Sequence, residues 1–210
     1  MAFVVHVGAI QRLLPAMFAM RVECRCTVMC KAGIAVMMFE HCASLIAGRA
    51  ALLYKERGRA LVLALKHSDR HDIVRPAGLW LARAAKGILR EDVLIAPVPL
   101  HWTRMVRRRY NQSSLIGQAM AREVGAPFSG DLLVRSKAQH RWMVNLGKKG
   151  LLNYEFIVVN PKRAELIKGR AILLVDDVIT SGATLAACAE TCLKSQASEV
   201  CVVTLARVAK

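Results

Sequence analysis

Residues 172–184 read ILLVDDVITSGAT, and the pattern of this stretch decides the fold class. The run is apolar up to Val175, turns to two adjacent acids and continues into small and hydroxylated residues. A strand that is apolar along its whole length is typical of a parallel sheet covered by helices on both faces. Residues 171–177 are therefore predicted to form a buried strand that ends at Asp176 and Asp177.

The residues after this stretch predict a helix and a second strand. A helix over residues 183–194 is indicated by apolar residues at the spacing i, i+3, i+4 and i+7. These residues are Leu185, Cys188, Ala189 and Cys192. The run EVCVVTLARV at 199–208 predicts the second strand, and a strand–helix–strand connection of this kind joins parallel strands with a right-handed crossover. The two cysteines of the helix are expected in the core, not at a metal site.

The middle of the chain has the order strand, loop, helix. VLIAPVPL at 93–100 predicts a buried strand with a rigid exit, because proline fixes its own φ and restricts the residue before it. The basic loop HWTRMVRRRYNQ follows. The next stretch, 113–125, is predicted to be an amphipathic helix capped by Ser113 or Ser114. Its apolar residues recur every four positions at Ile116, Met120 and Val124.

Two more helices are predicted ahead of that strand, where apolar and basic positions alternate at helical spacing. One begins with residues 59–66 and the other covers residues 77–89. Between them, two histidines four residues apart with two acids nearby fit a metal site on a helix, although surface histidines near a helix end are the alternative. The residues concerned are His67, Asp69, His71 and Asp72.

The first 46 residues are predicted to be a separate N-terminal segment, and residues 47–210 the α/β domain. Four cysteines in this segment raise the hypothesis of a zinc site, to which His41 would add a ligand: Cys24, Cys26, Cys30 and Cys42. Their spacing does not reproduce the two CxxC knuckles of a structural zinc site. An irregular segment with incidental thiols is the favoured alternative, because residues 1–45 show no helical or strand period.

Composition narrows the classes of partner. The chain has 210 residues, is 55% hydrophobic and carries a formal net charge of +16, which favours anionic partners such as nucleic acid, phosphorylated metabolites or acidic membranes. A basic composition without a specific partner is the alternative. No apolar run reaches the ~20 residues of a transmembrane helix. Residues 1–20 lack the basic start of a secretory signal, and seven cysteines without a regular framework fit a reducing compartment, so a cytoplasmic protein is expected.

The stretch after the two acids has the chemistry of a phosphate site. A helix N-terminus presents unpaired N–H groups and the positive end of the helix dipole, and Gly182 permits close approach of a ligand. Thr180, Ser181 and Thr184 add hydroxyl donors. Because a carboxylate repels a bare phosphate, the acids are expected to meet sugar hydroxyls or a magnesium ion. A plain P-loop is excluded, since GxxxxGK[ST] is absent.

At this point the sequence resembles a known family. LLVDDVITSGAT resembles the 5-phosphoribosyl 1-diphosphate (PRPP) signature of the type I phosphoribosyltransferases. APVPLHWTRMVRRRYNQSSLIGQAMA and LALKH at 63–67 resemble segments of the ComF subgroup, which comprises competence-associated, phosphoribosyltransferase-like proteins. The resemblance covers about residues 47–208. It implies the type I phosphoribosyltransferase fold, with a Rossmann-like central parallel sheet flanked by helices.

The resemblance also implies a set of site residues. Asp176 and Asp177 would be the catalytic pair that holds the ribose hydroxyls, with Mg²⁺ bound to the diphosphate of PRPP and no protein side chain assigned as a metal ligand. The 5′-phosphate would be held by Thr180, Ser181, Gly182, Ala183 and Thr184. Diphosphate or a second anion would be held near Arg104, Arg107, Arg108 and Arg109, for which a solvated basic loop is the alternative.

Two functions follow from these expectations. One is a PRPP-binding protein that transfers phosphoribosyl to an unknown acceptor and releases diphosphate. The other is a non-catalytic DNA-uptake or DNA-processing protein that binds single-stranded DNA or competence proteins and keeps the fold as a scaffold or PRPP sensor. The sequence departs from the family in two places: it lacks the paired CxxC knuckles at the start, and residues 141–156 match the family's middle segment only faintly.

Overall fold

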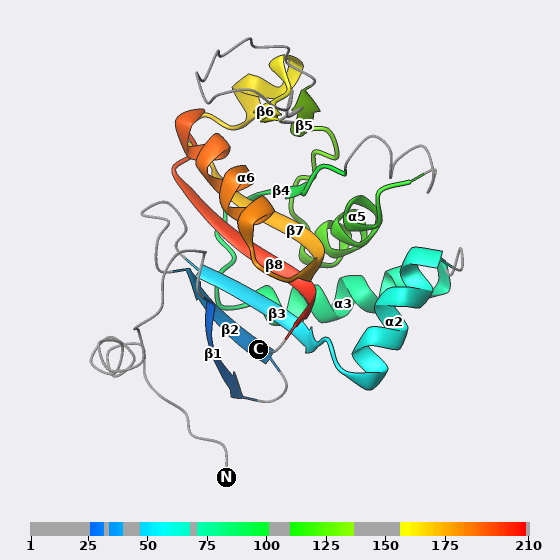
Figure 1. Cartoon of the computed structure of the whole chain (residues 1–210). Helices are drawn as coiled ribbons and strands as arrows, with labels where there is room; N and C mark the ends of the chain where they lie inside the picture. The colour runs from blue at the N-terminus through cyan, green and yellow to red at the C-terminus, as the bar shows by residue number, and fades with distance from the viewer. Residues whose placement is uncertain are drawn as a thin grey trace, which may run out of the picture.

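The fold is built on one six-stranded sheet (Figure 1). The computed structural model describes residues 26–31, 34–39, 47–67, 71–100, 110–136 and 156–208. The strand order across the sheet is β1-β2-β3-β8-β7-β4. The strands are β1 (Cys26–Lys31), β2 (Ile34–Phe39), β3 (Ala47–Leu53), β4 (Leu94–Pro97), β7 (Ala171–Ile179) and β8 (Glu199–Arg207).

Four neighbouring strands of this sheet are parallel, which confirms the predicted fold class. β3 pairs with β8, β8 with β7 and β7 with β4, all in parallel. β1 and β2 extend the sheet as an antiparallel hairpin against β3. The expectation of an irregular N-terminal segment is therefore wrong for residues 26–31 and 34–39, because main-chain pairing with the sheet forms strands there without a regular apolar period.

Helices cover both faces of the sheet. On one face lie α2 (Glu56–His67), α3 (Val74–Ala85) and α5 (Gln112–Val124), and on the other lies α6 (Ala183–Lys194) (Figure 1). A second, two-stranded sheet of β5 (Leu133–Ser136) and β6 (Phe156–Val159) packs beside α6. Two short 3₁₀ helices complete the elements, η2 (His71–Ile73) and η3 (Pro161–Leu166).

The core consists of two layers of apolar side chains, one on each face of the sheet. Ile172 and Leu174 of β7 point to the α6 layer, while Leu173 and Val175 point to the layer of α2, α3 and α5. β7 is therefore buried on both faces, as its continuous apolar run predicts. The helix over 183–194 is confirmed, and its cysteines are core residues with no exposed surface. Burial raises the pKa of the Cys192 thiol to about 12.

Two predicted helix boundaries are wrong. The helix expected over 77–89 runs from Val74 to Ala85 instead, because Pro76 lies in its first turn, where backbone N–H groups have no intrahelical acceptor and proline is tolerated. The helix expected to be capped by Ser113 or Ser114 is capped by Asn111, whose side chain accepts a hydrogen bond from the Ser113 amide. The hydroxyl of Ser113 is thereby left for another partner.

Several expectations concern residues outside the described ranges. Cys24, His41, Cys42 and Asp69 lie outside them, so the zinc and histidine hypotheses stay untested. Among the residues that the structure does describe, no group of three or more His, Cys, Asp or Glu side chains could hold a metal ion. Within the same ranges, no helix is long and apolar enough to cross a membrane.

Candidate functional site at the end of β7

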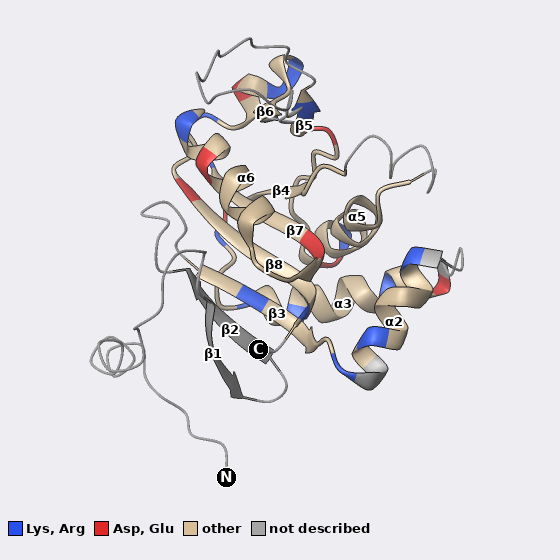
Figure 2. Ribbon diagram, in the orientation of Figure 1, with Lys and Arg blue, Asp and Glu red and all other residues tan. Residues whose placement is uncertain are grey.

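Three elements meet where β7 reaches the carboxyl-terminal edge of the sheet. In open α/β sheets, ligands bind outside the carboxyl ends of the parallel strands. β7 brings Asp176 and Asp177 to this edge, α5 begins there after β4, and the last turn of α2 reaches it with Lys66. Figure 2 shows the acids as a red segment at the end of β7. β7 runs to Ile179, two residues beyond the predicted end at Asp177, so the acids lie within the strand and are not its last residues.

Asp176 is held by two hydrogen bonds to the same oxygen. The hydroxyl of Ser113 donates to Oδ1 over 2.9 Å, and the backbone N–H of Asp177 donates to Oδ1 over 2.8 Å. Among the described residues, no donor contacts Oδ2. The side chain thus has one oxygen fixed by the protein and one available to a ligand.

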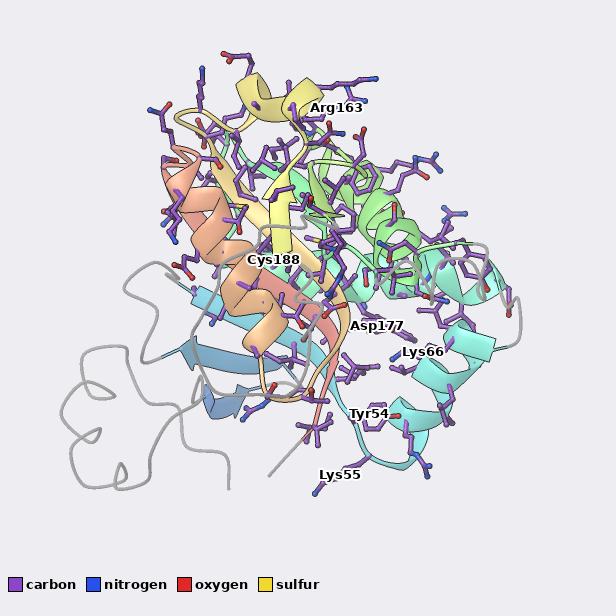
Figure 3. All side chains as sticks on the ribbon, turned by 45° about the horizontal axis from the view of Figure 1, so that its top comes forward. Tyr54, Lys55, Lys66, Arg163, Asp177 and Cys188 are labelled. Carbon is purple, nitrogen blue, oxygen red and sulfur yellow. The ribbon has the colours of Figure 1, made fainter. Side chains whose placement is uncertain are left out.

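Asp177 is held by a cation from another helix, α2. Nζ of Lys66 lies 3.0 Å from Oδ2, and the two side chains are 21% and 13% exposed, respectively (Figure 3). Within the described ranges, no donor contacts Oδ1 of Asp177. We call Asp176 and Asp177 the acid pair: each member has one oxygen bound by the protein and one without a described partner.

The pKa of Asp176 is raised from its ordinary value to about 7. Burial is the main cause, because it disfavours the charged carboxylate, and the adjacent charge of Asp177 acts in the same direction. The hydrogen bonds from Ser113 and the Asp177 amide, together with the charge of Lys66, lower the pKa but do not offset these effects. Near neutral pH, Asp176 therefore holds a proton more readily than an exposed carboxylate would.

Asn111 fixes the start of α5 and thereby places Ser113. Its Oδ1 accepts from the Ser113 amide over 3.0 Å, which is the capping bond of the helix. Its Nδ2 donates to the carbonyl oxygen of Val98 over 3.1 Å and ties the helix to the end of β4. The two ends of the loop between β4 and α5 consequently lie together at the carboxyl edge of the sheet.

The expected phosphate residues follow β7 and run into the first turn of α6, which begins at Ala183; we call this stretch loop 180–184. Gly182 is the N-cap of α6 and has a φ of 82°, a left-handed conformation that favours glycine. Thr180, Ser181 and Thr184 are exposed, and the Ser181 hydroxyl accepts only a long bond of 3.4 Å from the Ala183 amide. No acidic residue lies in the first turn of α6, so this turn itself supplies no negative charge to the positive end of the helix dipole.

Two buried polar side chains next to the acid pair lack hydrogen-bond partners within the described part of the chain. They are Gln112, whose amide nitrogen and oxygen are both unpaired, and Thr204, whose hydroxyl is unpaired. Gln112 precedes Ser113 in α5, and Thr204 lies opposite Asp176 in the β7–β8 register. Each unpaired group costs about 1–3 kcal/mol of folding free energy, and in a native protein such a group calls for a reason, such as a catalytic role or a bound water or ion.

The structure joins some of the predicted site residues and adds others. The acid pair lies near the end of β7 and loop 180–184 leads into α6, so the two lie close together in the chain, as expected. The four arginines at 104, 107, 108 and 109 lie outside the described residues, so their role stays a prediction. Lys66, Asn111 and Ser113 are site residues that the sequence does not predict: the resemblance of LALKH assigns Lys66 no role, and Ser113 is predicted only as a helix cap.

Comparison with known proteins agrees with this architecture. Residues 111–210 match the family described as "Phosphoribosyl transferase domain". The chain is 33% identical over 157 residues to "DNA utilization protein YhgH" of Shigella flexneri, a match that covers 70% of this chain and 66% of that protein. It is 33% identical over 116 residues to "Competence protein F" of Haemophilus influenzae, covering 54% and 49% of the two chains.

These sequence matches support a ComF-type, phosphoribosyltransferase-like protein. Its match spans just under two thirds of the length of the YhgH relatives and about half of the competence protein. Among solved structures, a hypoxanthine phosphoribosyltransferase from Staphylococcus aureus is similar with a TM-score of 0.42 and 14% identity, over 65% of this chain and 64% of that one. The predicted ComF resemblance is confirmed by the sequence relatives.

Proposed function

We propose that this ComF-type chain binds PRPP with Mg²⁺ at the end of β7 and transfers its phosphoribosyl group to an acceptor. The observation that carries this proposal is the arrangement of the acid pair. Oδ2 of Asp176 and Oδ1 of Asp177 are free of described donors, while the other two oxygens are held by Ser113 and Lys66. Two fixed acceptors on adjacent residues suit the two neighbouring hydroxyls of a ribose.

Loop 180–184 supplies the second half of the proposed site. The backbone N–H groups at the start of α6 and the exposed hydroxyls of the loop would donate to the 5′-phosphate. With both ends of the sugar held, C1 of the ribose is directed toward the space outside the sheet edge. Orientation of this kind accelerates a displacement because the reacting carbon no longer has to be positioned.

In the proposed transfer, a nucleophile on the acceptor forms a bond to C1 while the bond from C1 to the diphosphate oxygen breaks. The electron pair of that bond leaves with the diphosphate. Mg²⁺, when bound to the diphosphate, neutralises the developing charge. The acid pair alone offers two carboxylates, one of them paired with Lys66, which fits a metal carried mainly by substrate phosphates.

The test is calorimetric titration of the chain with PRPP in the presence of Mg²⁺. We expect micromolar affinity, about −8 kcal/mol, and a loss of at least ~100-fold in the Asp176→Asn/Asp177→Asn double variant. The double variant Glu165→Gln/Glu190→Gln is the control, because it removes two charges from exposed ion pairs with Lys168 and Lys194. Absence of both heat and thermal stabilisation in the unmodified chain would contradict the proposal.

A second candidate function is contact with single-stranded DNA. It is favoured by the net charge of +16 and by the names of the relatives, which refer to DNA utilization and competence. Binding to phosphates should weaken steeply as salt rises. We expect it to persist in the Asp176→Asn/Asp177→Asn variant, measured by fluorescence anisotropy of a labelled oligonucleotide. If no anisotropy change occurs even at low salt, this second candidate is rejected.

A further inference from the structure

Lys66 places a positive charge where two adjacent carboxylates would otherwise attract a metal ion. Its Nζ lies 3.0 Å from Oδ2 of Asp177, close to the separation of a strong charge-assisted hydrogen bond. Mg²⁺ and Ca²⁺ both require oxygen ligands, and two neighbouring carboxylates are a usual starting point for such a site. In this chain, the local counter-charge of Asp177 is supplied by the protein itself.

The fold holds Lys66 in this position. Val62 and Leu65 of α2 are buried in the core layer beneath it, so the helix cannot rotate without exposing them. Gly58 lets the helix begin close to β3, because a Cβ at this position would overlap the carbonyl oxygen of Leu53. With only 21% of its side chain exposed, Lys66 is directed inward, unlike a lysine on a solvated helix face.

The two oxygens of the acid pair that the protein binds, Oδ1 of Asp176 and Oδ2 of Asp177, are held by donors of different kinds. Ser113 of α5 offers a neutral hydroxyl to Asp176, and Lys66 of α2 offers an ammonium group to Asp177. A hydroxyl orients a carboxylate without changing the charge of the site, whereas an ammonium group also cancels one negative charge. The other two oxygens, Oδ2 of Asp176 and Oδ1 of Asp177, therefore belong to a pair with less net negative charge than two bare carboxylates would have.

We propose that Lys66 is a specificity-determining residue of the acid pair, whose ammonium group excludes a divalent cation from Asp177 and leaves Oδ2 of Asp176 and Oδ1 of Asp177 to neutral sugar hydroxyls. This inference rests on the proposed PRPP site and names the part of the ligand that the pair selects. Lys66 acts on the ligand through Asp177 and is a positioning residue. Removal of the ammonium group should accordingly weaken sugar binding and strengthen cation binding.

Two titrations of the full chain test this inference. The first follows PRPP binding at a fixed Mg²⁺ concentration, and the second follows binding of Mn²⁺ alone by electron paramagnetic resonance at pH 8. Lys66→Met should bind PRPP roughly tenfold more weakly and Mn²⁺ roughly tenfold more tightly than the unmodified chain, a change of one decade in each constant. Lys66→Arg keeps the charge and should stay within about threefold of the unmodified chain in both titrations.

The outcomes separate this inference from the proposed function. Equal Mn²⁺ affinity in all three proteins, or unchanged PRPP affinity in Lys66→Met, overturns the role of Lys66. A merely structural lysine would lower thermal stability in Lys66→Met without any gain of Mn²⁺ binding, which also overturns it. If the unmodified chain binds no PRPP, the proposed function fails, whereas the Mn²⁺ titration still decides whether Lys66 excludes a cation. Lys66→Gln repeats both titrations should Lys66→Met not fold.

Discussion

The acid pair and loop 180–184 are only a few residues apart, yet they are built in opposite ways. Each acid is fixed by side chains from other elements, Ser113 of α5 and Lys66 of α2. The loop has almost no such support: its hydroxyl residues are exposed, and Ser181 makes one long bond within the loop. The first region is pre-organised by tertiary contacts, whereas the second depends on backbone conformation and helix position.

The two regions lose folding free energy for different reasons. Burial of the acid pair raises the pKa of Asp176, so ionisation of this residue opposes folding. Loop 180–184 carries instead a local conformational requirement at Gly182, whose φ is 82°. Substitutions in the acid pair should therefore change both stability and binding, whereas loss of a hydroxyl side chain in the loop should act mainly on binding.

The largest effect is expected from Gly182→Ala, which tests the loop side of this comparison. A Cβ disfavours a φ of 82° by about 1–2 kcal/mol, and any shift of the backbone moves the N–H groups that would hold the phosphate. We expect PRPP affinity to fall roughly 100-fold in calorimetry.

Gly169→Ala is the matched control for that change. Gly169 has a φ of 68°, and an added Cβ would meet no atom within 4 Å. It lies before the opposite end of β7, which begins at Ala171, and is therefore remote from loop 180–184. It should show a similar loss of thermal stability with no loss of affinity. Equal PRPP affinity in the two glycine variants would show that loop 180–184 does not hold the phosphate.

The next effect concerns the stability of the acid pair. Because the folded pKa of Asp176 is about 7, above the ordinary value of 3.8, its ionisation costs stability as pH rises through this range and costs little at pH 4. Asp176→Asn keeps an oxygen to accept both existing hydrogen bonds. We expect it to raise the free energy of unfolding by roughly 2 kcal/mol more at pH 8 than at pH 4, in urea denaturation.

The control for this pH effect is Asp131→Asn. Asp131 is half-exposed and paired with Arg163, far from burial of the kind that surrounds Asp176. It should gain no stability at pH 8 relative to pH 4. If Asp176→Asn behaves in the same way as Asp131→Asn, the carboxylate of Asp176 is not opposing folding, and the contrast between the two regions is lost.

The sequence predicted the local parts of this architecture well. The continuous apolar run before the acids and the helical spacing of Cys188 and Cys192 depend on neighbours in the chain, and both predictions are confirmed. The β1–β2 hairpin escaped prediction because its strands are formed by main-chain pairing with β3. The partners of the acid pair were not predicted for a related reason. The contacts of Lys66 and Ser113 with the acids join segments that are distant in the sequence, and no local pattern of residues indicates such contacts.

The smallest effect is expected from Ser181→Ala, which tests how far the loop depends on its side chains. The hydroxyl of Ser181 is exposed and makes only the 3.4 Å contact with the Ala183 amide, so thermal stability should be unchanged. Loss of one hydrogen bond to a charged phosphate should lower PRPP affinity by roughly tenfold.

Ser195→Ala, at the other end of α6, is the control and should not affect affinity. An unchanged affinity in Ser181→Ala would mean that the backbone N–H groups of α6 hold the phosphate without help from this hydroxyl. The loop would then bind its ligand through the backbone alone, whereas the acid pair binds through side chains.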